Sequence, residues 1–191
     1  DAPGISITPM KTVGRRTIHT NIVSFDNVRV SESRMLGTLN NGWGQLMHGL
    51  NLERICLAAS AIGNMQRIVD YASSYARDRI QFGKPIASYQ AVAHKLVDMQ
   101  IMTDAARGLL YKCTSLLDHD QDCSSASVIA KIFATENNVR CADMGIQVMG
   151  GAGYSMDHLM QMFWRDSRVG PIGGGTNEIL RNVVSKRIGL S

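Results

Sequence analysis

The chain has no hydrophobic run as long as a membrane span, although 45% of its 191 residues are hydrophobic. A transmembrane helix needs about 20 consecutive apolar residues, so an integral membrane protein is excluded. Together with 19% charged residues, this composition is typical of a soluble globular protein and not of a disordered or fibrous one.

A basic stripe with interleaved aromatic residues is also missing. The net charge is only +4, aromatic residues make up 6% of the chain, and the Lys and Arg residues are mixed with acidic ones. Nucleic-acid-binding surfaces combine clustered cations with stacking rings. We therefore expect no nucleic-acid partner, and the mild positive charge would attract an anionic substrate only weakly.

Cysteine is scarce and irregularly spaced. The four cysteines form no CxxC motif and no spacing that suits a metal ion; they are Cys56, Cys113, Cys123 and Cys141. Free cysteines inside helices act as small core residues. We expect reduced thiols in a reducing compartment, no disulfide framework and no metal site.

Residues 1–38 differ from the rest of the chain. Prolines and glycines separate short strand-like stretches at Ile5–Ile7 and Asn21–Phe25, and Phe25–Val30 has the pattern of a turn leading into a third extended piece. So few strands do not make a stable sheet alone. We expect the incomplete end of a β-domain, in a chain that begins at Asp1 without a signal-peptide pattern and is a piece of a longer protein.

Residues 39–191 have helical periodicity. Apolar residues at steps of three and four predict helices over about 41–77, 92–117 and 128–149, a stop at 150–153, a short helix near 156–163 and a final helix over 177–187. Long helices with such stripes and short connections predict a mainly α fold, an antiparallel helix bundle.

Glu53 interrupts the apolar stripe of the first helix. The stripe consists of Leu46, Leu50, Leu57, Ala61, Met65, Ile68 and Ala72. Position 53 falls on the same face, and burying an ionised carboxylate there costs several kcal/mol unless the charge is paired. Glu53 is therefore either a structural partner of Arg54 or of another cation, or a functional carboxylate.

Three segments have features that suit an anionic ligand. Gly173–Gly175 precede a helix start at Thr176, where backbone N–H groups attract negative charge, although Thr176 also suits an ordinary N-cap. Arg79 and Gln81 follow the long helix, where a cation also complements the helix dipole. Gln147 with Gly150 and Gly151 forms the third segment.

Four motifs at these places resemble one family. They are Arg79–Ile86, Gln147–Tyr154, Arg165–Asp166 and Gly175–Arg181, in an order and spacing similar to the C-terminal part of acyl-CoA dehydrogenases. These flavoenzymes introduce an α,β double bond into acyl-CoA thioesters. The resemblance covers the whole helical part, with residues 1–38 similar to the end of the family's middle β-domain, and implies FAD, an acyl-CoA substrate, an electron-transfer flavoprotein as electron acceptor and a homotetramer.

The resemblance also implies roles for single residues. Arg79, Gln81 and Phe82 would reach the FAD pyrophosphate of a neighbouring subunit, although Gln81 stands where many relatives have Thr or Ser. The other cofactor positions are Gln147, Gly150 and Gly151 along the adenosine half of FAD and Thr176 and Glu178 near the flavin.

The catalytic position departs from most relatives, which read Tyr-Glu-Gly-Thr before the last helix. Gly174 occupies the place of that glutamate and has no side chain to act as a base. Isovaleryl-CoA and long-chain enzymes carry their base on the long helix, and their motif is similar to Leu50–Ala58, which makes Glu53 the implied base. Glu53 would take the α-proton while the β-hydride passes to flavin N5, with the backbone N–H of Gly174 bonded to the thioester carbonyl.

The substrate and the alternatives follow from the same residues. Gly173 and Gly174 leave space for a branched acyl chain, ahead of short or medium straight chains, and Arg54 orients the substrate, orients Glu53 or pairs with an acid. An acyl-CoA oxidase of the same fold and a non-catalytic helical oligomerisation fragment remain open. We expect a bacterial cytoplasm or a mitochondrial matrix as the compartment.

Overall fold

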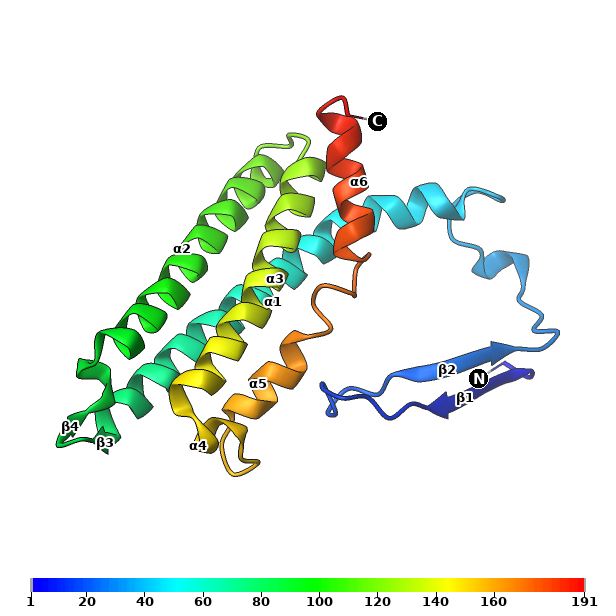
Figure 1. Ribbon diagram of the computed structural model, residues 1–191. Coiled ribbons are helices and arrows are strands. Elements are labelled where there is room, and N and C mark those ends of the chain that lie inside the picture. The colour runs from blue at the N-terminus through cyan, green and yellow to red at the C-terminus, as the bar shows by residue number, and fades with distance from the viewer. Residues whose placement is uncertain (1, 191) are drawn as a thin grey trace. The chain divides into compact units, whose positions relative to one another are not determined.

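The computed structural model describes residues 2–190, apart from the side chain of His48 (Figure 1). The chain divides into two compact units, residues 1–49 and residues 50–191. The domain boundary expected after residue 38 stays a prediction. Within the described residues, no helix combines the length and the apolar character that crossing a membrane requires.

The first unit contains a two-stranded antiparallel sheet. Strand β1 (Ile5–Pro9) pairs with β2 (Asn21–Phe25), with Ile5 opposite Phe25. Both predicted strands are confirmed, but residues 28–30 pair with no strand among the described residues, so the third strand signal does not produce a strand. Every residue of β1 and β2 is exposed. The expectation that so few strands do not make a stable sheet alone stays a prediction.

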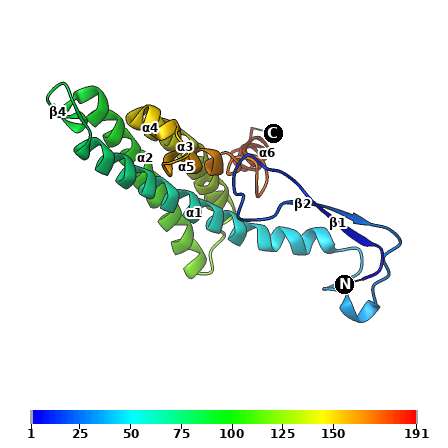
Figure 2. The same cartoon turned by 90° about the horizontal axis from the view of Figure 1, so that it is seen from below.

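Three long helices dominate the chain and run in alternating directions (Figures 1 and 2). The helical elements and the small hairpin are, in chain order, α1 (Gly42–Asp78), β3 (Ile80–Gln81), β4 (Lys84–Pro85), η2 (Ile86–Ser88), α2 (Gln90–Asp118), α3 (Ser124–Met149), α4 (Gly151–Tyr154), α5 (Met160–Ser167) and α6 (Asn177–Arg187). A short 3-10 turn, η1 (Glu32–Arg34), precedes α1. The antiparallel bundle is confirmed, whereas the β3–β4 hairpin was not predicted.

The short helices differ from the prediction in two places, one of which is α4, a turn of helix over Gly151–Tyr154 where a stop was expected. The α3 helix ends at Gly150, whose φ is 59°, and α6 spans the predicted residues. The helix expected near residues 156–163 begins instead at Met160, because the Ser155 hydroxyl accepts a hydrogen bond from the Asp157 N–H at 3.2 Å and holds that segment in a turn.

The core of the bundle is filled mainly by Ala, Met and Ile side chains of α1, α2, α3 and α5. Gly145 of α3 lets these helices approach closely, since a Cβ placed there would lie 2.6 Å from Sδ of Met160 and 3.1 Å from Cγ2 of Ile68. Burying a side chain such as Ile68, which is 0% exposed, contributes about 1.5–3 kcal/mol. The bundle is therefore a tight frame for the loops at its surface.

Candidate active site

Glu53 is exposed on α1, so the prediction that it lies on the buried face is wrong. The buried side chains among the described residues of α1 are all at most 7% exposed: Ile55, Ala58, Ala61, Ile62, Met65, Ile68, Val69, Ala72 and Ala76. Steps of three and four extend this series back to Arg54. The sequence stripe had joined Leu46 and Leu50 to it, although an α-helix drifts by about 20° per seven residues. The Glu53 carboxylate consequently lies beside the core face.

Arg54 occupies the position in the buried stripe that was expected for Glu53. Its side chain is half-buried, and its Nη1 donates to Oδ1 of Asn51 at 3.2 Å. Its Nε is buried, with no acceptor among the described residues. Burial lowers the pKa of the guanidinium, and the Glu53 carboxylate partly opposes that lowering. Among the described residues Arg54 forms no ion pair, and its contact with substrate stays a prediction.

Residues 170–176, called the glycine loop below, lead into α6. Gly174 and Gly175 have φ values of 65° and 91°, which are accessible to glycine at little cost. The Thr176 hydroxyl accepts a hydrogen bond from the N–H of Ile179 at 3.3 Å. The ordinary N-cap interpretation of Thr176 is thereby confirmed, and its contact with a flavin stays a prediction.

The structure brings Glu53 and the glycine loop together, although they are far apart in the sequence. A Cβ placed on Gly174 would lie 3.7 Å from Oε1 of Glu53 and 2.4 Å from Cδ1 of Leu57. The Glu53 carboxylate thus borders the space that a side chain at position 174 would enter. Within the described part of the chain, the Gly174 N–H has no hydrogen-bond acceptor. A carboxylate and a free backbone donor are therefore close to one point.

A buried lysine behind the loop was missed by the sequence analysis. Lys131 of α3 is 0% exposed, and its Nζ donates to the Gly175 carbonyl and to Oδ1 of Asn177, both at 2.9 Å. Burial lowers its pKa to about 8, and the nearby Arg54 guanidinium adds to that lowering. Carboxylates oppose the lowering: those of Glu178, Glu136 and Glu53. The signal that could have found Lys131 is its place in the buried series of α3 that includes Ala134 and Cys141.

The predicted Arg79–Phe82 segment forms the β3–β4 hairpin. Phe82 is 93% exposed and has a φ of 52°, a conformation that is uncommon for a residue other than glycine. Arg79 is also exposed, and the Gln81 amide donates to the neighbouring Ile80 carbonyl at 2.7 Å. An exposed ring held in an uncommon conformation beside a guanidinium suits a binding surface.

Gln147, Gly150 and Gly151 lie at the end of α3. Gln147 and both glycines are exposed, and a Cβ placed on either glycine would meet no atom within 4 Å. The backbone is therefore open to a ligand here. Figures 1 and 2 show the β3–β4 hairpin and α4 at the same end of the bundle. Gly150 is 19 residues beyond Lys131, or about 28 Å along the α3 axis, so this end is separate from Glu53 and Gly174.

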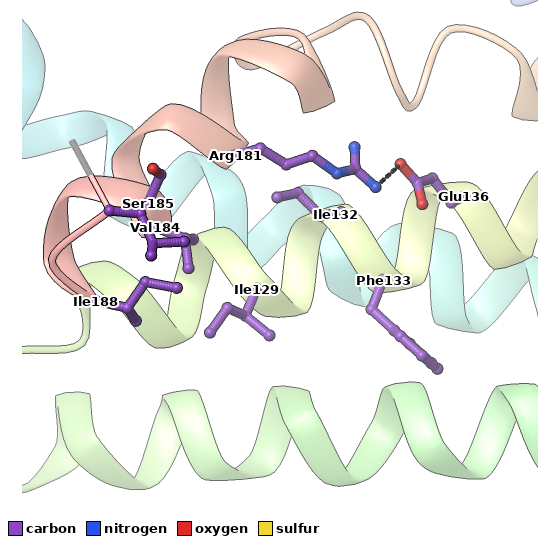
Figure 3. A pocket seen from close by; sticks show the side chains of 9 residues that line it. Ile129, Ile132, Phe133, Glu136, Arg181, Val184, Ser185 and Ile188 are labelled. Carbon is purple, nitrogen blue, oxygen red and sulfur yellow. Dashed lines mark hydrogen bonds and ion pairs between the residues drawn. The ribbon is translucent and has the colours of Figure 1, made fainter.

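Cavities open on the described part of the helical unit beside α6 and beside α5. Figure 3 shows an apolar groove of about 430 Å³ between α3 and α6, with the Arg181–Glu136 ion pair (2.7 Å) at its edge. A cavity of about 540 Å³ lies next to α4 and α5 and is lined by Asp143, Ile146, Tyr154, Met156, Gln161, Trp164 and Arg165. Neither lining includes Glu53 or Gly174. Within the described residues, no three His, Cys, Asp or Glu side chains gather as metal ligands.

Comparison with known proteins defines the class. Residues 40–189 match the family model described as acyl-CoA dehydrogenase, C-terminal domain. A probable acyl-CoA dehydrogenase of Bacillus subtilis, YngJ, is 36% identical over 189 residues, which covers 98% of this chain and 50% of that protein. The chain therefore belongs to the acyl-CoA dehydrogenase family, through its C-terminal domain, and spans about half the length of the curated relatives it matches.

Solved structures agree with this assignment. Butyryl-CoA dehydrogenase from Megasphaera elsdenii superimposes with a TM-score of 0.94 at 31% identity, over 98% of this chain and 49% of that one. An FAD-dependent dehydrogenase superimposes with a TM-score of 0.96 at 30% identity, over 100% of this chain and 52% of that one. The family resemblance and the fold are confirmed, whereas the isovaleryl-like placement of the base stays a prediction.

The exposed end of the bundle fits the chemistry of FAD. Arg79 would supply a cation for the pyrophosphate, Gln81 and Gln147 would supply amides, and the open backbone at Gly150 and Gly151 leaves room for close approach. These groups belong to one chain, but they do not meet Glu53 in it. Their assignment to FAD stays a prediction.

Proposed function

We propose that the complete protein containing this chain is an FAD-dependent acyl-CoA dehydrogenase whose base is Glu53. The observation that supports this best is the 3.7 Å separation between Oε1 of Glu53 and a Cβ position on Gly174, where most relatives carry their base. On the family resemblance, a carboxylate from α1 would take the place of the carboxylate that the loop carries in most other members. Glu53 would supply the carboxylate and Gly174 the backbone N–H, and together they would replace that single loop residue.

The chain's own groups would carry the proton chemistry. Glu53 removes the α-proton of the thioester, and the Gly174 N–H donates to the thioester carbonyl as negative charge develops on it. One donor of this kind lowers the activation barrier by on the order of 3–4 kcal/mol. The carboxylate and the N–H must therefore be held in a fixed relation. FAD, when bound, would accept the β-hydride.

The finer features follow from the same geometry and from the family resemblance. With no side chains at Gly173 and Gly174, space remains for a short, branched acyl chain, and Arg54 would orient the substrate or Glu53. Arg79, Gln81 and Phe82 of one subunit would hold the FAD of another in a homotetramer. Gln147, Gly150 and Gly151 would lie along the adenosine half of FAD, and Thr176 and Glu178 would lie near the flavin. Electrons would pass to an electron-transfer flavoprotein, in a bacterial cytoplasm or a mitochondrial matrix.

The direct test is Glu53→Gln in the complete protein, assayed with isovaleryl-CoA, butyryl-CoA and octanoyl-CoA and an artificial electron acceptor. We expect kcat to fall by about 10³-fold, within the range for loss of a general base, while bound FAD per subunit is unchanged. The matched control is Glu32→Gln, the same chemical change at an exposed residue of η1.

The possible outcomes separate the alternatives. Retention of more than a tenth of the activity in Glu53→Gln would show that another group is the base. Peroxide formation by the wild-type protein without an added acceptor would indicate an oxidase. A folded, FAD-loaded protein that oxidises none of the three thioesters would contradict the proposed function.

A further inference from the structure

Lys131 buries a charge that forms no ion pair among the described residues. The side chain is 0% exposed, and its Nζ contacts two neutral oxygens: the Gly175 carbonyl and Oδ1 of Asn177. Burying an ammonium group costs several kcal/mol even after relaxation, and an apolar side chain of similar length would fill the same volume without that cost. The two hydrogen bonds of the ammonium group indicate its role. One ends on the glycine loop, at Gly175, and the other ends on Asn177, the first residue of α6.

Asn177 connects Lys131 to the rest of the loop. Its Nδ2 donates to Oγ1 of Thr135 at 3.1 Å and to Oε1 of Glu136 at 3.2 Å, and its backbone N–H donates to the Pro171 carbonyl at 3.0 Å. Asn177 is itself 1% exposed. Lys131 thus holds the loop directly at Gly175, and it holds the loop indirectly at Pro171 through Asn177.

Backbone hydrogen bonds hold the parts of the loop on either side of Gly174: the Gly173 N–H donates to the Val169 carbonyl at 2.9 Å and the Asn177 N–H donates to the Pro171 carbonyl at 3.0 Å. Within the described residues, the N–H groups of Gly174 and Gly175 donate to no backbone acceptor. Glycines at 173, 174 and 175 give the backbone wide conformational freedom, which is lost on ordering. A charge-assisted hydrogen bond to the carbonyl of the next residue is strong and directional. The Gly174 N–H belongs to the peptide group two positions before the one that carries the Gly175 carbonyl. Its position is limited from both sides, because the Gly173 N–H donates to the Val169 carbonyl and Lys131 holds the Gly175 carbonyl.

We propose that Lys131 is a positioning residue that, with Asn177, holds the glycine loop so that the Gly174 N–H and the Glu53 carboxylate act on one substrate. This inference rests on the proposed function. It assigns to the lysine no contact with substrate or FAD.

The first test measures the loop without measuring activity. In the complete FAD-loaded protein, hydrogen–deuterium exchange of a peptide covering residues 170–180 is compared between wild type and Lys131→Met. The protected amides there include Gly173, which donates to the Val169 carbonyl, and Asn177. We expect exchange to be at least tenfold faster in Lys131→Met and unchanged in peptides of α2. Unchanged exchange in residues 170–180 would overturn the proposal.

The second test separates positioning from general stability. We expect Lys131→Met to lower kcat by about 10- to 100-fold, less than full removal of an oxyanion donor, with KM changed less than threefold and FAD content unchanged. The matched control is Lys112→Met on α2, whose side chain is exposed, and it should behave as wild type. A Lys131→Met enzyme with kcat within twofold of wild type would overturn the proposal.

A third variant covers the case in which Lys131→Met does not fold. Asn177→Ala removes one acceptor and the link to Thr135 while leaving the lysine in place, and it should give the same combination of faster loop exchange and lower kcat. Normal exchange and kcat in Asn177→Ala would overturn the proposal. Exchange is measured independently of turnover. A wild-type protein without dehydrogenase activity would contradict the proposed function, whereas the exchange data would still decide whether Lys131 holds the loop.

Discussion

The glycine-loop region and the hairpin end of the bundle hold their functional groups in opposite ways. Around Gly174, buried polar groups of α3 and α6 are joined by hydrogen bonds, with Lys131 and Asn177 at most 1% exposed. At the other end, Arg79, Gln81 and Phe82 project from a short hairpin, with Phe82 93% exposed. The first region is completed by contacts within the chain, whereas the second presents groups that remain open to another molecule.

This difference separates two physical requirements. Proton transfer needs groups fixed relative to each other within a fraction of an ångström, and buried networks provide that rigidity. A surface that binds a long anionic molecule instead needs accessible cations and amides. Mutations in the two regions should therefore have separable effects: kinetic in the first and on FAD affinity in the second.

Among the changes that test this comparison, Gly174→Ala in the complete protein should have the largest effect, which is on kcat. The new Cβ would lie 2.4 Å from Cδ1 of Leu57, in a backbone conformation with φ of 65° that an L-residue seldom adopts. The loop must then shift, and we expect kcat to fall by about 100-fold, as when an oxyanion donor is displaced. Steady-state kinetics with isovaleryl-CoA measures it.

Gly49→Ala serves as the matched control for this change, since a Cβ there would meet no atom within 4 Å. Activity of Gly174→Ala equal to that of the control would mean that the loop does not constrain catalysis, and the contrast between the two regions would be lost.

A smaller effect is expected at the hairpin. Arg79→Gln removes an exposed cation that makes no ion pair within the described residues, so the free energy of unfolding should change by less than about 0.5 kcal/mol. The FAD dissociation constant should rise about tenfold, as expected for a lost charge-assisted hydrogen bond.

Titration of the apo form of the complete protein with FAD, followed by flavin fluorescence, measures that constant. Arg77→Gln, at an exposed arginine two residues earlier, is the control. Equal FAD affinity in the two variants would remove Arg79 from the cofactor surface.

The smallest effect is a pH dependence from Lys131. Its pKa is lowered in the folded state from 10.5 to about 8, so the unfolded chain binds more protons than the folded chain between these values. Stability then rises with pH through that window, because the cost of burying the charge is relieved as the lysine deprotonates. The wild type should gain about 1 kcal/mol relative to Lys131→Met between pH 7 and pH 9.

Urea unfolding of both proteins at the two pH values, with the difference taken at each pH, isolates this lysine. A difference that is constant with pH, or that shifts in favour of Lys131→Met, would contradict the buried-charge description.

The sequence predicted most of the fold because the long helices have periodic apolar faces. The α6 helix begins and ends at the predicted residues, and α3 stops at Gly150 as expected. Helix-capping residues such as Thr176 and Gly150 are recognised from a few neighbouring residues, so they can be found without tertiary information. The β3–β4 hairpin was not predicted because its strands are only two residues long and depend on the backbone conformations of Phe82 and Gly83.

The sequence by itself determined the helix bundle and the family, and it predicted Glu53 and Gly174 as the pair of positions that carry the base and the oxyanion donor. Only the tertiary structure decided which charged side chain enters the core. The register of α1 against its neighbours places Arg54 in the buried stripe and leaves Glu53 exposed beside the glycine loop. A one-residue difference turns a helix position by about 100°, and which position faces inward depends on the packing of all the helices together.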